Sequence, residues 1–378
     1  MKKNFDKRIA DLRKGLEDKK TDCLLVFKDE NIFYLTGFYT KDSGSILIVT
    51  DTELILLVHF INTENAIKSA QIPGINIVQF LSEKIKKLSE ILCDKCVKNI
   101  SVEGNNVSHE LFINITGTMS KKGIKVKNHP GIVERLRVIK DEDEISLIRK
   151  SCSISLKAYK SISEMNYEEI TSFSEKGLAF NIESRMLDMG SDDRSFDFVV
   201  AGNSSASLPH YEPTRKRIKG GLLLLDIGCR FNNYCSDLTR TFFIDHDIGR
   251  FKNNRMINKL IKVYDIVLQA QAETIKECRP GLTCRELDLV SRQYIEQAGY
   301  GKQYGHSVGH GVGLEIHELP AVSYSDNTVL EEGMVITIEP GIYLEGRGGV
   351  RIEDIVVVRK NNCENLYGDS KKVKIIMQ

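Results

Sequence analysis

One hairpin constrains the second half of the chain more than any other stretch. Residues 220–244 read as two apolar strands joined at Asn232-Asn233, and each strand carries one aspartate, Asp226 or Asp237. We expect the two asparagines to form a two-residue hairpin loop, which fixes the register between the strands. The hairpin therefore determines where both aspartates point.

The predicted register pairs Asp226 with Thr239 and Asp237 with Gly228. Both carboxylates then lie on one face as diagonal neighbours, roughly 7–8 Å apart at their Cα atoms and within joint reach of a metal pair. The leucines before Asp226 are expected to hold its strand in a core, where an ionised carboxylate is costly unless it is paired or binds a metal. Asp226 is therefore either a protonated, hydrogen-bonded side chain or a metal ligand.

Length and charge exclude several classes of protein. A chain of 378 residues with 41% hydrophobic residues can form two domains with sizeable cores. Its 53 basic and 52 acidic residues leave a formal charge near zero, so we expect no nucleic-acid partner and no membrane surface. No window holds the ~18 uninterrupted apolar residues of a spanning helix, and the first residues contain no apolar signal core.

The nine scattered cysteines are typical of reduced thiols, so we expect a cytoplasmic protein.

Residues 1–130 alternate between helix-like and strand-like segments. Helices are expected at residues 5–16, 61–70 and 83–96, and strands at residues 22–27, 44–49, 53–58, 75–80 and 99–102. This alternation predicts a small α/β domain. The domain is expected to end at a break near Pro130-Gly131, and no cluster of histidines and carboxylates within it forms a site.

The second domain, expected over residues 131–378, mixes long helices with strands. Asp141 is expected to cap its first helix, whose acidic first turn is favoured by the helix dipole. Further helices are expected at residues 167–189, 253–277 and 283–299, and strands at residues 196–201, 334–339 and 350–358. Helices packed outside an antiparallel sheet make this an α+β domain.

A segment rich in glycine and histidine follows the last of these helices. It carries His306, His310 and His317, with glycines at positions 309, 311 and 313. Glycine allows the backbone to approach a site closely and permits positive φ. These glycines argue against a helical zinc motif for His306 and His310.

Two late strands add further carboxylates. Residues 334–339 are expected to form a strand in which the Glu339 side chain points to the face opposite the isoleucines. In the next strand, Arg351 and Glu353 are expected to share one face. Together the candidates comprise two aspartates, one histidine and two glutamates. Four carboxylates carry about −4, which balances two divalent ions, and oxygen ligands with one imidazole suit manganese, cobalt or iron, with zinc also compatible. Two such ions can activate a water toward a carbonyl.

With these motifs in place, the chain resembles the pita-bread metallopeptidases, which include aminopeptidase P, prolidase and methionine aminopeptidase. The resemblance runs from Asn31–Phe38 through Leu136–Ile145 to Val350–Asp354. It implies an α+β pita-bread catalytic domain preceded by a smaller α/β creatinase-type N-terminal domain, often as a homodimer. The metal ligands that it implies are Asp226 (DIG), Asp237 (SDLTRT), His310 (GHGVGLEIHE), Glu339 (IEPGIY) and Glu353 (VRIED).

Within the family, the chain resembles the proline-peptidase branch. Glu353 follows Glu339 by only 14 positions, and a domain of about 130 residues precedes the catalytic one. The resemblance implies hydrolysis of the bond between an N-terminal residue and a following proline, with two divalent ions, Mn²⁺ before Co²⁺, Fe²⁺ or Zn²⁺. The substrate is a proline-containing peptide, and whether it is a dipeptide or a longer chain stays open.

The resemblance also implies roles for the remaining site residues. The matching positions are His210, His306, His317, Tyr343 and Arg351, with His306 and Tyr343 on the substrate side. Glu339 is expected to receive a proton from the attacking water and pass it to the leaving nitrogen. His210 and His317 are expected to bind the carbonyl oxygen, and Arg351 to hold Glu353 or the substrate.

Two alternative functions are compatible with the same fold. One is a metal-free hydrolase of the creatinase type on the same fold, and the other is a binding protein that has lost catalysis. The intact set of five ligands argues against both. The chain departs from the family in two places. The first is the cysteine pair of the aspartate hairpin, Cys229 and Cys235, of which Cys235 shares a strand face with Asp237 and is expected to be a small buried residue. The second is Leu319, which stands where relatives often carry tryptophan.

Overall fold

The computed structural model describes residues 4–17, 19–245, 254–368 and 375–376. The chain forms two compact units, Met1–Arg137 and Val138–Gln378. The expected boundary after residue 130 precedes helix α6 (Ile132–Arg137), whereas the division between the units follows it. Helix α6 belongs to the first unit because it packs on α1 (Phe5–Glu17) and α2 (Asp29–Thr36).

The first unit is built on a six-stranded sheet. Its strands are β1 (Cys23–Val26), β2 (Ile46–Thr50), β3 (Leu54–His59), β4 (Asn76–Phe80), β5 (Asn99–Val102) and β6 (Lys125–Asn128). Their order is β4-β3-β2-β1-β5-β6, with β2 antiparallel to both neighbours and the other pairs parallel. Beyond β3, the 3₁₀ helix η1 (Phe60–Asn62) and α3 (Thr63–Ser69) lead toward β4.

Two helices complete the core of this unit. Leu88 of α4 (Lys84–Asp94) and Ile115 of α5 (His109–Ser120) pack with Leu25 and Ile48 of the sheet. The apolar residues of β1, β2 and β3 are buried along their length, as strands covered by helices require. The predicted small α/β domain is confirmed.

The second unit contains five described helices and several small sheets. The helices are α7 (Glu142–Ser163), α8 (Tyr167–Thr171), α9 (Glu175–Asp188), α11 (Arg255–Glu277) and α12 (Cys284–Gln297), with 3₁₀ turns η2 (Asn203–Ser207) and η3 (Gly301–Gln303). The strands are β7 (Asp193–Arg194), β8 (Val199–Gly202), β9 (Gly221–Ile227), β10 (Cys229–Phe231), β11 (Tyr234–Cys235), β12 (Leu238–Ile244), β13 (Gly309–Gly311), β14 (Glu318–Val322), β15 (Val335–Ile338), β16 (Gly341–Leu344), β17 (Gly348–Arg351), β18 (Asp354–Val358), β19 (Cys363–Asn365) and β20 (Ile375–Ile376).

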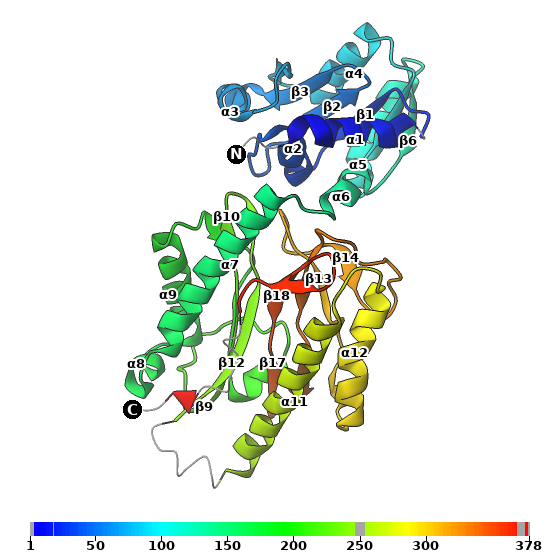
Figure 1. Cartoon of the computed structure of the whole chain (residues 1–378). Helices are drawn as coiled ribbons and strands as arrows, with labels where there is room; N and C mark the ends of the chain where they lie inside the picture. The colour runs from blue at the N-terminus through cyan, green and yellow to red at the C-terminus, as the bar shows by residue number, and fades with distance from the viewer. Residues whose placement is uncertain (1–3, 18, 246–253, 369–374, 377–378) are drawn as a thin grey trace. The chain divides into compact units, whose positions relative to one another are not determined.

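Helices flank the two larger sheets of this unit, which are ordered β20-β12-β9-β8 and β14-β13-β15-β18-β19. Figure 1 shows α7 and α9 along one side of the strands and α11 and α12 along the other. Leu260 and Val263 of α11 pack with Leu224 of β9, Phe243 of β12 and Ile342 of β16. The predicted α+β arrangement is confirmed. No helix in the described part of the chain is long and apolar enough to cross a bilayer.

The aspartate hairpin forms as predicted. Asp226 lies directly opposite Thr239 in the β9-β12 pair, and β10 and β11 continue the same register to the loop. Asn232 and Asn233 have φ of 48° and 69°, the left-handed conformation that this two-residue loop requires at both positions. The loop fixes the register, and the register places the two aspartates.

Helices α7 and α8 begin where predicted, but α8 ends early, at Thr171. Asp141 accepts a hydrogen bond from the Glu144 N–H at 2.9 Å, and Glu144 returns one to the Asp141 N–H at 3.0 Å. The single helix expected over residues 167–189 is two helices. It is divided because Ser174 caps a new start, with its Oγ accepting from the Gly177 N–H at 3.1 Å.

Candidate metal centre

Three of the four carboxylates lie where the chain passes from one sheet to another. Asp237 lies between β11 and β12, Glu339 between β15 and β16, and Glu353 between β17 and β18. The strand expected over residues 350–358 is divided at Glu353, because Arg351 pairs with β16 whereas the residues after Glu353 pair with β15. Arg351 and Glu353 therefore do not lie in one strand as expected, although both side chains line the same cavity. Strand ends from different sheets instead converge on one point.

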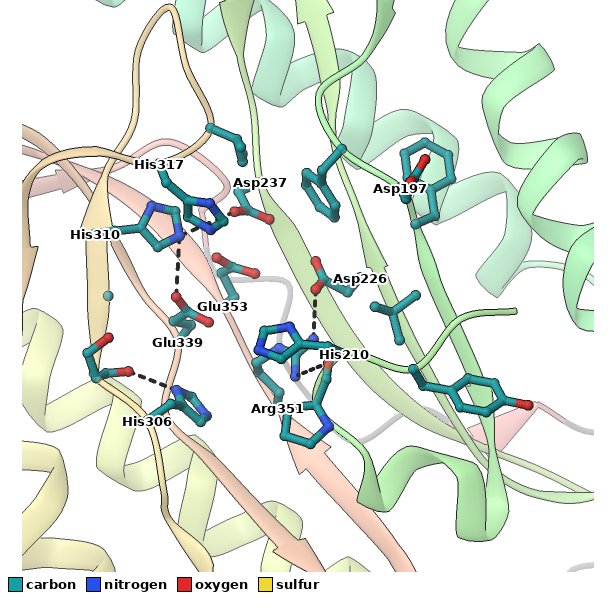
Figure 2. Close-up of a pocket in the computed structure, with 18 of the residues that line it drawn as sticks. Asp197, His210, Asp226, Asp237, His306, His310, His317, Glu339, Arg351 and Glu353 are labelled. Atoms are coloured by element: carbon teal, nitrogen blue, oxygen red, sulfur yellow. Dashed lines mark hydrogen bonds and ion pairs between the residues drawn. The ribbon is translucent and has the colours of Figure 1, made fainter. Parts of the chain in front are cut away.

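All ten predicted site residues line one cavity of about 530 Å³. They are His210, Asp226, Asp237, His306, His310, His317, Glu339, Tyr343, Arg351 and Glu353. Figure 2 shows the four carboxylates gathered at its centre, with His310 and His317 beside them and His210 on a separate loop. The structure thus brings together residues that lie up to 143 positions apart in the sequence (from 210 to 353).

His310 lies close to two of the carboxylates. Its Nε2 is 3.4 Å from Glu339 Oε1 and 3.6 Å from Asp237 Oδ2. Asp237, His310 and Glu353 each offer one ligand atom, and these three atoms lie within 4.8 Å of one another. An ion placed among them would meet two carboxylate oxygens and one imidazole nitrogen.

The protonation of His310 suits this position. Its Nδ1 lies 3.0 Å from the carbonyl of Gly311, which can only accept a hydrogen bond, so Nδ1 carries the proton and Nε2 presents a lone pair. Burial lowers the pKa of His310 to about 4, so the ring is neutral near pH 7. A neutral imidazole whose second nitrogen is fixed by a carbonyl is the form in which histidine binds metals.

The carboxylates repel one another in a buried setting. Burial and then the Glu353 carboxylate raise the pKa of Asp237 well above its usual range, and burial and then Glu339 do the same for Glu353. Burial raises the pKa of Glu339 to about 8. Two buried oxygens, Asp226 Oδ1 and Glu353 Oε1, have no hydrogen-bond partner among the described residues. Clustered anions with free oxygens fit divalent cations, which would replace both the missing partners and the missing positive charge.

Arg351 supplies the positive charge nearest to the carboxylates. Its Nη2 donates to Asp226 Oδ2 at 2.7 Å, and its Nη1 donates to the hydroxyl of Tyr343 at 2.7 Å. Tyr343 in turn lies 3.1 Å from His306 Nε2. Arg351 therefore holds Asp226 and begins a chain of hydrogen bonds to His306, whereas a threonine rather than Arg351 bonds Glu353.

That threonine is one of two that sequence reasoning did not identify as site residues. Thr239 Oγ1 donates to Glu353 Oε2 at 2.6 Å and accepts from Arg351 Nε at 3.1 Å. Thr337 Oγ1 accepts from the His310 N–H at 3.1 Å and lies 3.4 Å from Glu339 Oε1. Both could have been found by strand parity, because Thr239 faces Asp226 and Thr337 precedes Glu339 by two residues.

The two departures from the family pattern are not in the cavity lining. Cys235 is fully buried, and its Sγ lies 3.6 Å from the carbonyl of Leu314. Burial raises the pKa of its thiol to about 12, so it is a neutral packed side chain, as predicted. Leu319 is 44% exposed and does not form a wall of the pocket.

A buried arginine bonds the backbone and the neighbour of a site carboxylate, and its loss should lower the free energy of unfolding of the second unit. Arg240 is 1% exposed and donates to the Glu353 carbonyl at 2.6 Å and to Asp354 Oδ1 at 2.7 Å. Arg240→Met leaves Asp354 buried without its cation, which typically costs about 3–5 kcal/mol. We expect the urea midpoint of the second unit to fall clearly in this variant.

The matched control removes an arginine from an exposed pair. Arg149 bonds Glu364 at 2.7 Å, with the two side chains 43% and 38% exposed, so Arg149→Met should cost about 0–1 kcal/mol. Equal midpoints for Arg240→Met and Arg149→Met would contradict the structural role given to Arg240.

Comparison with known families covers most of the chain. Residues 146–360 match metallopeptidase family M24, and residues 8–139 match the creatinase/prolidase N-terminal domain. Among curated proteins, a Xaa-Pro dipeptidase from Pyrococcus furiosus is 36% identical over 361 residues, covering 95% of this chain and 97% of that protein.

Solved structures are similar over nearly their whole length. A Xaa-Pro dipeptidase from Bacillus anthracis superposes with a TM-score of 0.89 at 31% identity, covering 98% of this chain and 100% of that one. An X-Pro aminopeptidase from Thermotoga maritima superposes with a TM-score of 0.86 at 30% identity, covering 97% and 99%. Proteins named for both dipeptidase and aminopeptidase activity are thus similar to this chain to nearly the same degree.

Proposed function

This chain belongs to metallopeptidase family M24 and is a metallo-exopeptidase, and we propose that it cleaves the bond between an N-terminal residue and a following proline. Its pita-bread catalytic domain and creatinase-type N-terminal domain agree with the fold predicted from the sequence. The observation that carries the proposal is the convergence of four carboxylates and His310 on one cavity, where two buried oxygens have no partner among the described residues.

We propose that Asp226, Asp237, His310, Glu339 and Glu353 hold two divalent ions, with Mn²⁺ first and Co²⁺, Fe²⁺ or Zn²⁺ as alternatives. When bound, such ions lower the pKa of a water toward neutrality and polarise a carbonyl. The four carboxylates and the neutral imidazole supply hard oxygen donors and one nitrogen, which supports this choice of metals.

The proposed roles of the other residues follow from their contacts. The Glu339 carboxyl moves the proton, receiving it from the attacking water and giving it to the leaving nitrogen. His210 and His317, which line the cavity, donate to the carbonyl oxygen as charge develops on it. Arg351 orients Asp226 and, through Tyr343, keeps His306 in place at the substrate side.

The cavity wall supports a proline substrate. Proline lacks a backbone N–H and its ring fixes φ, so general peptidases handle it poorly and an apolar pocket suits its ring. The lining includes the apolar side chains of Phe196, Phe198, Val199, Pro209 and Pro213, besides Ile316 and Ala321. We propose that this wall receives the proline ring.

The oligomeric state and the location are proposed mainly from the family resemblance. We propose a homodimer, as in many family members, and a cytoplasmic location. The nine cysteines are free thiols, which supports a reducing compartment. Size-exclusion chromatography with light scattering tests the dimer, and a single monomer peak at micromolar concentration would contradict it.

The proposed function is tested with matched peptides and controlled metal. Purified protein should contain about two divalent ions per chain and hydrolyse Xaa-Pro or Xaa-Pro-Yaa-Yaa at least about tenfold faster than the same peptide with alanine in place of proline. Chelation should abolish activity and Mn²⁺ or Co²⁺ should restore it, because four clustered carboxylates do not stay ionised together without cations.

Each alternative gives a different result in this assay. Full activity in metal-free protein would identify a creatinase-type hydrolase, and metal binding with no hydrolysis of either peptide would identify an inactive binding protein. Equal rates on the proline and alanine peptides would contradict the proline preference. Faster turnover of Xaa-Pro than of Xaa-Pro-Yaa-Yaa would assign a dipeptidase, and the reverse an aminopeptidase.

A further inference from the structure

We infer that Glu175 is a positioning residue, which holds the loop of residues 208–217 so that His210 faces the substrate. The inference rests on the proposed function of the same cavity. It concerns a residue that lies outside the lining and 35 positions before His210 in the sequence.

Glu175 binds the loop through one carboxylate oxygen. The residue is 3% exposed, and its Oε2 accepts hydrogen bonds from the Tyr211 hydroxyl at 2.8 Å, the Thr214 N–H at 3.0 Å and the Thr214 hydroxyl at 2.7 Å. Three donors on one charged oxygen form a strong, geometrically restrictive anchor. The anchor begins at the residue directly after His210.

The start of helix α9 holds the far end of the same loop. Glu175 and Lys176 donate their backbone N–H groups to the carbonyls of Lys216 and Thr214 at 3.0 and 2.9 Å, and Ser174 forms a bridge with Arg217. The first N–H groups of a helix have no partner within it, so here they are satisfied by the loop. Backbone bonds therefore fix residues 214–217, and the Glu175 side chain extends this hold to Tyr211, whose hydroxyl also lies 3.4 Å from Thr214 Oγ1. On the other side of His210, Arg351 Nη1 donates to the Pro209 carbonyl at 3.5 Å, a longer contact than any of the three to Glu175.

The loop forms one side of the cavity. Five consecutive residues, 209 to 213, belong to the lining. Residues 208–216 lie in no helix or strand, so no regular hydrogen-bond ladder fixes their conformation. His210 is itself exposed, and its ring has no hydrogen bond among the described residues. The position of His210 thus depends on the loop, and Glu175 gives the loop its shortest side-chain hydrogen bonds next to His210 in the described part of the chain.

The effect of losing this anchor should be confined to the substrate side. None of the five proposed metal ligands lies in the loop, and none contacts Glu175 through a hydrogen bond in the described part of the chain. Glu175→Gln replaces the charged acceptor with a neutral amide that holds three donors poorly. Displacement of a catalytic group by about 1 Å can cost roughly 10²-fold in rate, so we expect kcat/KM to fall about 10- to 100-fold while two metals remain bound.

A double-mutant cycle tests whether Glu175 acts through His210. Glu175→Gln, His210→Ala and the double variant are compared with the wild type in kcat, KM and metal content on a proline peptide. If the inference holds, Glu175→Gln costs about 10- to 100-fold in the wild-type background and less than about twofold in the His210→Ala background. Equal losses in both backgrounds, or loss of metal from Glu175→Gln, would overturn it.

Two further variants keep the test decisive. Thr214→Val keeps the side-chain shape and removes one donor to Glu175, together with the acceptor of the Lys216 N–H. Thr214 lies outside the cavity lining, so the variant should lower kcat/KM severalfold and again only when His210 is present. If Glu175→Gln does not fold, additive losses for Thr214→Val overturn the inference by themselves. The matched control is Glu169→Gln in neighbouring α8, whose carboxylate accepts from the Asn166 N–H at 2.8 Å and which should leave kcat/KM unchanged.

A measurement without substrate separates this inference from the proposed function. Hydrogen–deuterium exchange of residues 208–212 should rise at least about threefold in Glu175→Gln, while residues 305–317 exchange as in the wild type. Wild-type protein that cleaves no proline peptide would refute the proposed function alone. Unchanged exchange at residues 208–212 would refute the positioning role of Glu175, whatever the activity.

Discussion

Glu339→Gln is expected to lower kcat by roughly 10²–10⁴-fold on a proline peptide while the protein stays folded. An amide cannot accept a proton from the attacking water or return one to the leaving nitrogen, and it is a poorer metal ligand than a carboxylate. The fold should persist because the backbone N–H of Glu339 donates to the Val308 carbonyl at 2.7 Å, a bond that the substitution leaves intact.

The measurement must separate loss of the proton carrier from loss of metal. We expect kcat to stay low in Glu339→Gln even with excess Mn²⁺, when metal analysis shows the sites filled. The matched control is Glu345→Gln, an exposed glutamate in the turn between β16 and β17, which should turn over like the wild type. Wild-type kcat in Glu339→Gln would mean that another group carries the proton, and recovery by Mn²⁺ alone would mean that Glu339 acts only as a ligand.

Local sequence signals were sufficient wherever a structure depends on neighbouring residues. The two-asparagine loop fixed the register of a hairpin, and Asp141 with Glu144 marked the start of α7. Both could be predicted because the contacts that form them join residues only a few positions apart. Strands β1 to β5 were predicted close to their observed bounds for the same reason. The residue types of the metal centre could also be collected from the sequence, since all of them fall in or beside segments predicted as strands or glycine-rich turns.

The sequence did not show where strands change sheets or which distant side chains meet. The segment around Glu353 has the composition of one continuous strand. It is divided because the residues before Glu353 pair with β16 and the residues after it pair with β15. The bond from Arg351 to Asp226 joins residues 125 positions apart, so no local pattern could have selected Asp226 rather than Glu353 as its partner. The grouping of the ligands came from the family resemblance rather than from spacing.

The break before α9 illustrates how a missed boundary hides a functional residue. A continuous helix over residues 167–189 would have made Glu175 one more acidic residue on an exposed helix. The structure starts α9 at Glu175, so the carboxylate and two N–H groups of the helix start face the His210 loop. The signal in the sequence was Ser174, a residue favoured at helix caps, directly before a glutamate.

The two histidines of the glycine-rich segment should respond differently to the same substitution. His310 Nε2 lies 3.4 Å from Glu339 and 3.6 Å from Asp237, so His310→Ala should remove a metal bond and lower both metal content and rate. His317 stacks edge-on against it with ring centroids 4.4 Å apart, yet His317 is exposed toward the cavity and forms no ion pair with the carboxylates in the described structure.

His317→Ala should therefore keep its metals and turn over slowly. A hydrogen-bond donor to the substrate carbonyl oxygen, as charge develops on it, typically contributes roughly 10²–10³ in kcat. Removing such a donor leaves the proposed metal ligands unchanged. Measuring both metal stoichiometry and kcat for the two variants decides between the two roles. The rings are in contact, so their positions alone do not show which of them binds metal. Loss of metal from His317→Ala together with its retention by His310→Ala would reverse the assignment, placing His317 on the ions and His310 on the substrate.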